Sequence, residues 1–172
     1  MGGHADHGDR GRGPSAPELT GRGAYTSGMS PALRGHFADY GSFHATAGNK
    51  ACHSVGIPLI FFAVIALLAH VPLLALGGFT LTLAEPVILA ITLYYLRLDA
   101  ALAAMMLVLS AVLAAAGRLV PVYAALVLFV LGWVLQFVGH YVYEKKSPAF
   151  FRNVTHLLVG PLWILAKATG RA

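Results

Sequence analysis

The sequence predicts an all-α integral membrane protein: a bundle of about four transmembrane helices, preceded by an interfacial amphipathic helix and followed by a broken helical segment. Hydrophobic residues make up 58% of the 172 residues, and charged residues only 11%. A soluble globular domain has roughly 25% charged residues. Four apolar runs also approach the roughly 20 residues that cross a bilayer as a helix, and turn-forming residues separate them.

Residues 1–30 are expected to be a disordered tail, and residues 31–172 a single helical membrane domain. The tail contains mainly Gly, Ser, Pro, Arg and Asp, and it has almost no apolar surface to bury. Ser30 and Pro31 then predict a helix start, because Ser caps helix N-termini and Pro suits the first helical position.

The next segment is expected to be an amphipathic helix that lies at the membrane interface. Apolar residues recur at spacings of three and four over residues 33–47, and His44 lies on the same stripe. Gly48 and Asn49 are expected to break this helix. His44 and His53 are nine residues apart, so an unbroken helix would turn them to opposite faces, whereas a break lets both face one site.

The four expected spans occupy residues 57–76, 79–96, 100–116 and 122–143. Gly77 and Gly78 are expected to form the turn between the first two spans. A last segment, residues 147–168, is interrupted by Gly160 and Pro161. This interruption makes it too broken to predict a fifth span.

The basic residues predict that both termini lie in the cytoplasm. Four spans place both ends of the chain on one side, and the Lys and Arg residues fall on that side with the single exception of Arg118. The membrane would be the inner membrane of a bacterium, or the endoplasmic reticulum of a eukaryote. A nucleic-acid partner is not expected, because it needs a continuous basic face. The topology also places five candidate residues together at the cytoplasmic surface: His44, His53, His140, Glu144 and His156.

The candidate chemistry lies near the end of the last expected span, where Gln136, His140 and Glu144 follow one another at spacings of four. This spacing stacks the three side chains on one helical face. With His44 and His53 they offer neutral imidazoles, a carboxylate and open coordination positions, a set that suits non-haem Fe(II) that also binds oxygen. Zinc with an activated water, for hydrolysis, is the next alternative.

Other polar residues are expected beside this site. Gln136, Asn49 and Asn153 are candidates for orienting the imidazoles, since a ligating histidine usually donates its other N–H to an acceptor. The single cysteine, Cys52, excludes an internal disulfide and a cysteine-based zinc cage. The acidic headgroup of a lipid substrate is expected to bind near four residues: Lys145, Lys146, Arg152 and His156.

Two motifs in the chain are distinctive. The first is Tyr40-x3-His44-x4-Asn49-x3-His53-x2-Gly56-Ile57-Pro58-Leu59, and the second is Trp133-x2-Gln136-Phe137-x-Gly139-His140-x3-Glu144-x3-Pro148-Ala149. In this order they resemble the 2-hydroxy fatty acid dioxygenase family of small membrane proteins, known from phytosphingosine breakdown in fungi. The resemblance covers about residues 36–165.

The resemblance implies Fe(II)-dependent α-oxidation, in which a long-chain 2-hydroxy fatty acid reacts with O2 and loses its first carbon. By position it implies that the iron ligands are His44, His53 and His140. It leaves open whether Glu144 ligates the metal or only orients a ligand. The catalytic candidates beside the ligands are Glu144, Gln136 and Asn49.

Two further classes of function remain as alternatives. A membrane zinc hydrolase acting on a lipid would use similar ligands. A non-enzymatic membrane scaffold or transporter would need only the spans, and it predicts no bound metal. A di-iron desaturase is excluded, because it needs paired clusters such as His-x3-His, which the sequence lacks.

Overall fold

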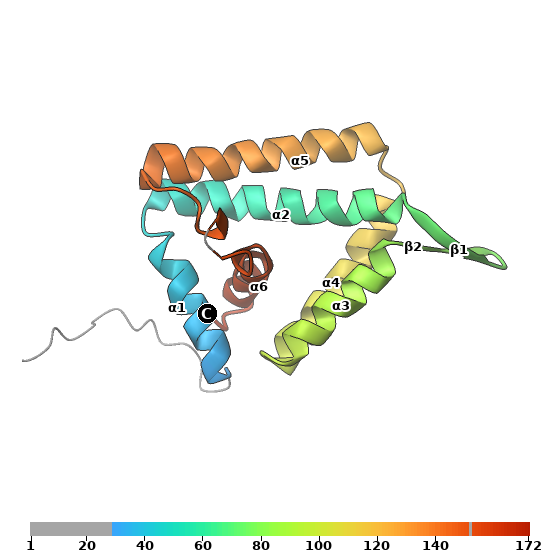
Figure 1. Ribbon diagram of the computed structural model, residues 1–172, viewed down its shortest axis with the longest axis horizontal. Helices are drawn as coiled ribbons and strands as arrows, with labels where there is room; N and C mark the ends of the chain where they lie inside the picture. Colours follow the sequence, from blue (N-terminus) through green and yellow to red (C-terminus); the bar gives the residue numbers. More distant parts are fainter. Residues whose placement is uncertain (1–28, 152) are drawn as a thin grey trace, which may run out of the picture.

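Helices make up most of the described chain, residues 29–151 and 153–172, in the computed structural model, and the predicted helical membrane class is confirmed (Figure 1). The expected tail falls almost wholly on residues 1–28, which lie outside the described residues, as does the candidate Arg152. The elements in chain order are α1 (Pro31–Ser42), α2 (Ala47–Ala69), β1 (Pro72–Leu76), β2 (Phe79–Thr82), α3 (Ala84–Leu96), α4 (Ala100–Gly117), α5 (Val122–Phe137), the π-helix η1 (Val138–Glu144), the 3-10 turn η2 (Ala149–Phe151) and α6 (His156–Ala168).

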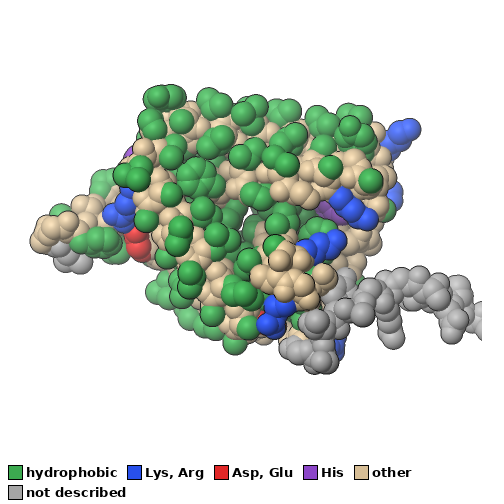
Figure 2. Space-filling view, turned by 180° about the vertical axis from the view of Figure 1, so that it is seen from behind, with side chains coloured by type: hydrophobic (Ala, Val, Ile, Leu, Met, Phe, Trp, Pro, Cys, Tyr) green, Lys and Arg blue, Asp and Glu red, His purple; other side chains and the backbone are tan. Residues whose placement is uncertain are grey.

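Among the described residues, three helical segments are long and apolar enough to cross a membrane: Ala47–Ala69, Ala100–Gly117 and Val122–Glu144. The last of these is α5 continued by η1, so the spans expected at residues 100–116 and 122–143 are confirmed as helices. Apolar side chains cover most of the molecular face in Figure 2, as contact with lipid requires. Basic side chains gather toward the end of the molecule away from the β-hairpin.

Two inclined helix pairs form the frame of the molecule. α2 and α5 lie side by side, while α3 and α4 form a second pair that meets the first near the hairpin and diverges from it toward the other end (Figure 1). α1 and α6 fill the wide end of this wedge. Their buried side chains pack with those of α3 and α4 in one apolar core, which includes Phe37, Tyr95, Met106 and Leu162.

Glycines bring α2 and α5 into close contact. Gly56 and Gly132 face each other, and a Cβ atom added at Gly132 would lie 2.6 Å from Cγ1 of Ile60 and 2.9 Å from the carbonyl oxygen of Gly56. Without a hydrophobic driving force in lipid, such small residues let two backbones approach and gain dispersion contacts. The pairing of α2 with α5 therefore depends on these two positions.

The start of α1 agrees with the sequence prediction. The Oγ of Ser30 accepts a hydrogen bond from the N–H of Leu33 at 3.2 Å, and Pro31 occupies the first helical position. Leu33, Phe37 and Tyr40 face inward and are buried. The predicted amphipathic stripe is confirmed as far as Tyr40, and His44 lies beyond the end of this helix.

The predicted helix break at Gly48 and Asn49 is wrong by a few residues. α1 ends at Ser42, and α2 begins at Ala47 with Thr46 as its N-cap. The reason is local: the Oγ1 of Thr46 accepts the N–H of Asn49 at 3.3 Å, which starts the helix before the glycine. The expected consequence is nevertheless confirmed, because the rings of His44 and His53 lie face to edge with their centroids 4.4 Å apart.

The first two expected spans have different boundaries in the structure. α2 ends at Ala69, and the following apolar residues form an antiparallel hairpin of β1 and β2 around the expected turn, with Gly77 at φ 58°. The second expected span therefore shrinks to α3, a helix of 13 residues. Pro72 cannot continue a helix without losing a hydrogen bond, and a two-glycine turn favours a hairpin, so the strands form instead.

The expected interruption at Gly160 and Pro161 is also wrong, because α6 runs through both residues from His156 to Ala168. Proline in a helix interior removes one hydrogen bond, which neighbouring helices can compensate in an apolar bundle. Gly160 lies against α2 and α1, where an added Cβ would be 3.3 Å from Cδ1 of Ile57 and 3.4 Å from the hydroxyl of Tyr40.

The close contact of α2 and α5 gives a stability prediction. Gly132→Ala should lower the free energy of unfolding by about 1–3 kcal/mol, because the new methyl group overlaps backbone that cannot move away cheaply. Thermal unfolding in detergent measures the change. Gly35→Ala is the matched control, since nothing lies within 4 Å of a Cβ there and alanine favours helix. Equal melting temperatures for Gly132→Ala and the unmodified protein would contradict this account.

Candidate metal centre

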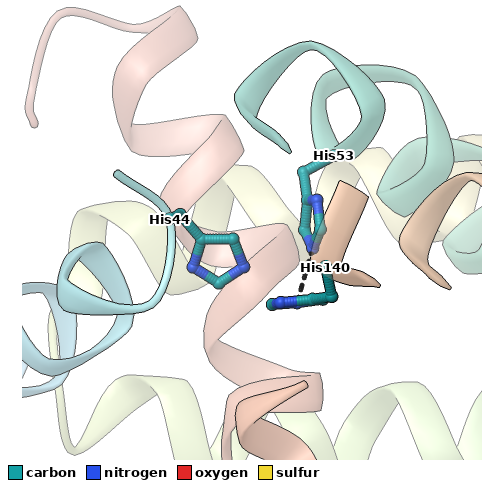
Figure 3. Close-up of side chains that lie close together, drawn as sticks. All are labelled: His44, His53 and His140. Atoms are coloured by element: carbon teal, nitrogen blue, oxygen red, sulfur yellow. Dashed lines mark hydrogen bonds between the residues drawn. The ribbon is translucent and has the colours of Figure 1, made fainter. Parts of the chain in front are cut away.

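Three buried histidines converge from three elements of the fold. His44 lies on the linker between α1 and α2, His53 on α2 and His140 on η1. Each contributes one ring nitrogen to a group whose members all lie within 4.8 Å of one another, and the three rings point toward a common centre (Figure 3). The Nε2 atoms of His53 and His140 are 3.2 Å apart. The sequence expectation that these residues meet is confirmed.

Backbone carbonyl groups orient two of the rings. The Nδ1–H of His44 donates to the carbonyl of Tyr40 at 2.6 Å, and the Nδ1–H of His53 donates to that of Asn49 at 3.0 Å. Each bond leaves Nε2 with a free lone pair directed at the centre. Burial lowers the pKa of His44 to about 4, so its imidazole is neutral at physiological pH. A neutral imidazole is the form that binds a metal ion.

The donor set fits a cation. Within the described chain, the buried Nε2 of His44 has no hydrogen-bond partner. The Nε2 atoms of His53 and His140 face each other, although the Nε2 of His53 can only accept. A positive ion here would pair with the Nε2 lone pairs of His44 and His53, and with that of His140 when its proton is on Nδ1, whereas solvent is largely excluded from the site.

A π-helix places His140 in this group. η1 continues α5 with a wider turn, and π-helical turns occur frequently at functional sites. Gly139 lets this turn approach α2, since an added Cβ would be 2.7 Å from Oδ1 of Asn49 and 3.0 Å from Nδ1 of His53. Lys145 then ends η1 in the left-handed conformation at φ 53°.

Glu144 binds the linker that carries His44. Its Oε1 accepts the backbone N–H of Ala45 at 3.2 Å, and its Oε2 accepts the N–H and the Oγ1–H of Thr46 at 3.1 and 2.9 Å. The side-chain amide of Asn49 donates to the same Oε2 at 3.0 Å. These donors surround the buried carboxylate, which is not a member of the three-histidine group found in the described chain.

Asn49 connects the hydrogen bonds of Glu144 to His53 and to the linker that carries His44. Its side-chain N–H groups donate to Glu144 and, at 3.2 Å, to the carbonyl of Phe43, while its own backbone carbonyl accepts from His53. Asn49 is fully buried. The amide therefore holds the linker and the first turn of α2 in one arrangement, and it joins the hydrogen bonds around His44 to those around His53.

An apolar cavity of about 290 Å³ lies beside the centre, between the two helix pairs and α6. A small space of about 30 Å³ lies at the histidines themselves. Gln136, Phe150 and His156 line both spaces, so these three side chains separate the metal centre from the cavity. Aliphatic and aromatic side chains form the remaining wall, including Phe61, Ile91 and Trp133.

The structure separates the other candidates into two groups. Gln136 and His156 lie next to the histidines, as expected. Lys145 and Lys146 are exposed and are not among the residues that line the two spaces in the described chain. Asn153 is exposed too, and its Oδ1 accepts from the N–H and hydroxyl of Thr155, so it does not orient a histidine ring.

Sequence reasoning did not find Asp39. Its Oδ2 lies 2.7 Å from Nε2 of His156, and the two residues are 117 positions apart in the chain. Only the position of Asp39 directly before Tyr40, the first residue of the first motif, could have drawn attention to it. Phe150 was missed for a similar reason, because an aromatic residue near a membrane surface is common without a functional role.

Comparisons with known proteins agree with the geometry. A family model described as "2-hydroxy-palmitic acid dioxygenase Mpo1-like" matches residues 31–172. The 2-hydroxy-palmitic acid dioxygenase MPO1 of Saccharomyces cerevisiae is 33% identical over 136 residues, which cover 77% of each chain. No solved structure matches.

The hydrogen bonds of Glu144 give a prediction on metal affinity. Glu144→Gln keeps the shape but leaves one acceptor oxygen among several donors, so the linker with His44 should loosen. Metal affinity should fall about 10- to 100-fold, the usual cost of losing a residue that orients a ligand. Titration of the metal-free protein measures it.

Glu85→Gln is the matched control, because Glu85 also accepts from a threonine, Thr82, and pairs with Arg118 near the hairpin. It should bind metal as tightly as the unmodified protein. If Glu144→Gln bound metal with unchanged affinity, the hydrogen bonds of Glu144 would not support the metal centre. If it bound no metal at all, Glu144 would itself be a ligand.

Proposed function

The chain belongs to the Mpo1-like 2-hydroxy-palmitic acid dioxygenase family, and from this premise we propose that it is an iron-dependent enzyme that shortens long-chain 2-hydroxy fatty acids by one carbon. In the net reaction a 2-hydroxy acid and one O2 give the acid one carbon shorter, one CO2 and one H2O. The carbon that bears the hydroxyl is oxidised to a carboxyl group, and O2 is reduced. The bond between the first two carbons breaks.

The observation that carries this proposal is the position of the three-histidine centre directly beside an apolar cavity. His44, His53 and His140 would hold Fe(II) through their nitrogens. The bound iron would supply the redox chemistry with oxygen, since three imidazoles leave coordination positions open. Glu144 and Asn49 would act indirectly, by fixing the linker and the ring orientations.

The cavity would hold the hydrocarbon chain of the substrate. Its volume of about 290 Å³ is close to the lower end of ligand cavities, about 300 Å³, and its wall is mainly apolar. A chain buried there would leave the carboxyl and hydroxyl groups beside Gln136, Phe150 and His156. The reacting carbons would then be next to the metal centre and shielded from water by the surrounding side chains.

The protein would perform this reaction at the cytoplasmic surface of its membrane. The metal centre lies at the N-terminal end of α2, whereas the hairpin follows the other end of that helix. Near the hairpin, Arg118 pairs with Glu85 at 2.6 Å and lies over the ring of Phe79. Basic residues concentrated at the opposite end support a cytoplasmic location for both termini.

A zinc hydrolase remains the chemical rival, because three histidines also hold zinc in hydrolytic enzymes. A non-enzymatic scaffold would have no use for buried imidazoles whose lone pairs converge. The identity of the metal therefore decides between the enzyme classes.

The first prediction of the proposed function concerns metal and substrate. Protein purified anaerobically should bind one Fe(II), and it should convert 2-hydroxypalmitate to the acid one carbon shorter with consumption of O2. His140→Ala should lose both the iron and the activity, because it removes one of three ligands. Chain length of the product by mass spectrometry and iron content measure the two effects.

His36→Ala is the control, because His36 lies on α1 and is not part of the three-histidine group of the described chain. Activity with Zn(II) alone, in protein free of iron, would refute the dioxygenase and favour the hydrolase. Iron retained at full stoichiometry by His140→Ala would remove the proposed centre.

The second prediction concerns orientation. A reporter inserted after Lys146 should be found in the cytoplasm, and one inserted between Gly77 and Gly78 on the opposite side, because these positions lie at opposite ends of the bundle. Reporter activity on the same side of the membrane at both positions would show that the chain does not cross the bilayer in the proposed way.

A further inference from the structure

His156 joins the surface of the protein to the boundary between cavity and metal centre. Its Nε2 lies 2.7 Å from Oδ2 of Asp39. The side chain of His156 is only 6% exposed, whereas that of Asp39 is 52% exposed. The ring packs between Tyr40, with centroids 5.8 Å apart, and Phe43, with centroids 5.6 Å apart. The same ring lines both the cavity and the space at the histidines.

The hydrogen bond to Asp39 determines which ring nitrogen of His156 donates and which accepts. An ionised carboxylate only accepts hydrogen bonds, so the Nε2 of His156 must donate to Asp39. In the neutral ring the other nitrogen, Nδ1, is then an acceptor. This Nδ1 is buried and has no hydrogen-bond partner in the part of the chain that is described. A buried acceptor without a donor is unfavourable, and it points to a donor that arrives with a ligand.

A purely structural role accounts poorly for this arrangement. A hydrogen bond from this ring to a half-exposed carboxylate contributes little to stability, because solvent competes for the carboxylate. A phenylalanine would fill the same space between Tyr40 and Phe43 without burying an unpaired nitrogen. The position of the unpaired atom at the junction of two spaces is what a binding role would require.

We propose that His156 binds the 2-hydroxyl group of the substrate through Nδ1 and so selects hydroxylated over plain fatty acids, with Asp39 positioning the ring. This inference rests on the proposed function. It assigns recognition of the 2-hydroxyl, which plain fatty acids lack, to the Nδ1 of His156. A plain fatty acid has no hydroxyl donor for Nδ1, so it leaves the nitrogen unpaired.

Gln136 completes the polar part of the boundary. It is buried, it lines both spaces, and its Nε2 also has no hydrogen-bond partner among the described residues. The amide can donate to a carboxylate oxygen while His156 accepts from the hydroxyl. A 2-hydroxy acid therefore matches the two unpaired groups, one acceptor and one donor, at the end of an apolar cavity.

The test is the equilibrium binding of 2-hydroxypalmitate and of palmitate to anaerobic, iron-loaded protein. Displacement of a bound fluorescent fatty acid measures both affinities. The unmodified protein should prefer the hydroxy acid. His156→Phe should weaken binding of the hydroxy acid roughly tenfold, the effect of one hydrogen bond, and leave palmitate binding and iron content unchanged. His156→Gln, which can still accept, should keep part of the preference.

Asp39→Ala and Asp39→Asn test the positioning role without disturbing the core, because the Asp39 side chain is half exposed. Asp39→Ala should raise the KM for the hydroxy acid several-fold with little change in kcat, and Asp39→Asn, which keeps an acceptor oxygen, should restore most of the loss. His36→Phe is the matched control for the aromatic substitution, and it should bind both acids like the unmodified protein.

The outcomes separate this inference from the proposed function. If the unmodified protein oxidises 2-hydroxypalmitate and both His156→Phe and Asp39→Ala keep its preference, the inference is wrong and the proposed function stands. If no oxidation occurs but the preference is present and is lost in these variants, the binding role is supported and the proposed reaction fails. An unmodified protein that binds both acids equally would overturn the inference. Should His156→Phe fail to fold, the two Asp39 variants decide.

Discussion

The hydrogen bonds of the Glu144 carboxylate to the linker between α1 and α2 are the constraint on which the metal centre depends. His44 lies on that linker, outside both helices, whereas His53 and His140 are held by α2 and η1. Glu144 accepts the backbone N–H groups of Ala45 and Thr46, and so ties the linker to the segment that carries His140. Charge-assisted bonds in a buried environment are strong and geometrically specific. Together with the bond of His44 to the Tyr40 carbonyl and that of Asn49 to the Phe43 carbonyl, they hold His44 opposite the other two rings.

The wedge between the two helix pairs contains an apolar cavity directly beside the metal centre. α6 lies in the wide end of the wedge, so its first residue, His156, reaches the same boundary as Gln136 of α5. One small set of side chains thus faces the three histidines on one side and the apolar cavity on the other. An enzyme acting on a lipid needs this arrangement, because the chain must be buried while the polar head is exposed to the reacting metal.

The sequence predicted features with strong local signals. The cap at Ser30, the lengths of α4 and of α5 continued by η1, and the placement of three histidines at one end of the bundle all follow from spacing and hydropathy. The structure of residues 70–83 was predicted wrongly, because a continuous apolar run does not distinguish strand from helix. The turn at Gly77 and Gly78 favours a hairpin there. The spacing of four also misled in part: η1 winds more widely than an α-helix, so Glu144 turns toward the linker. The pairing of Asp39 with His156 joins distant segments, and one sequence carries no signal for such a contact.

The central claim is that three imidazoles from three elements hold iron beside the cavity. X-ray absorption at the iron edge of anaerobic, iron-loaded protein tests it directly, because imidazole rings give a characteristic multiple-scattering pattern. The account predicts three imidazole nitrogens at roughly 2.1 Å, a typical distance for a metal–histidine bond, with the remaining positions filled by light atoms from solvent. A spectrum that requires fewer than three imidazoles in the unmodified protein would contradict it.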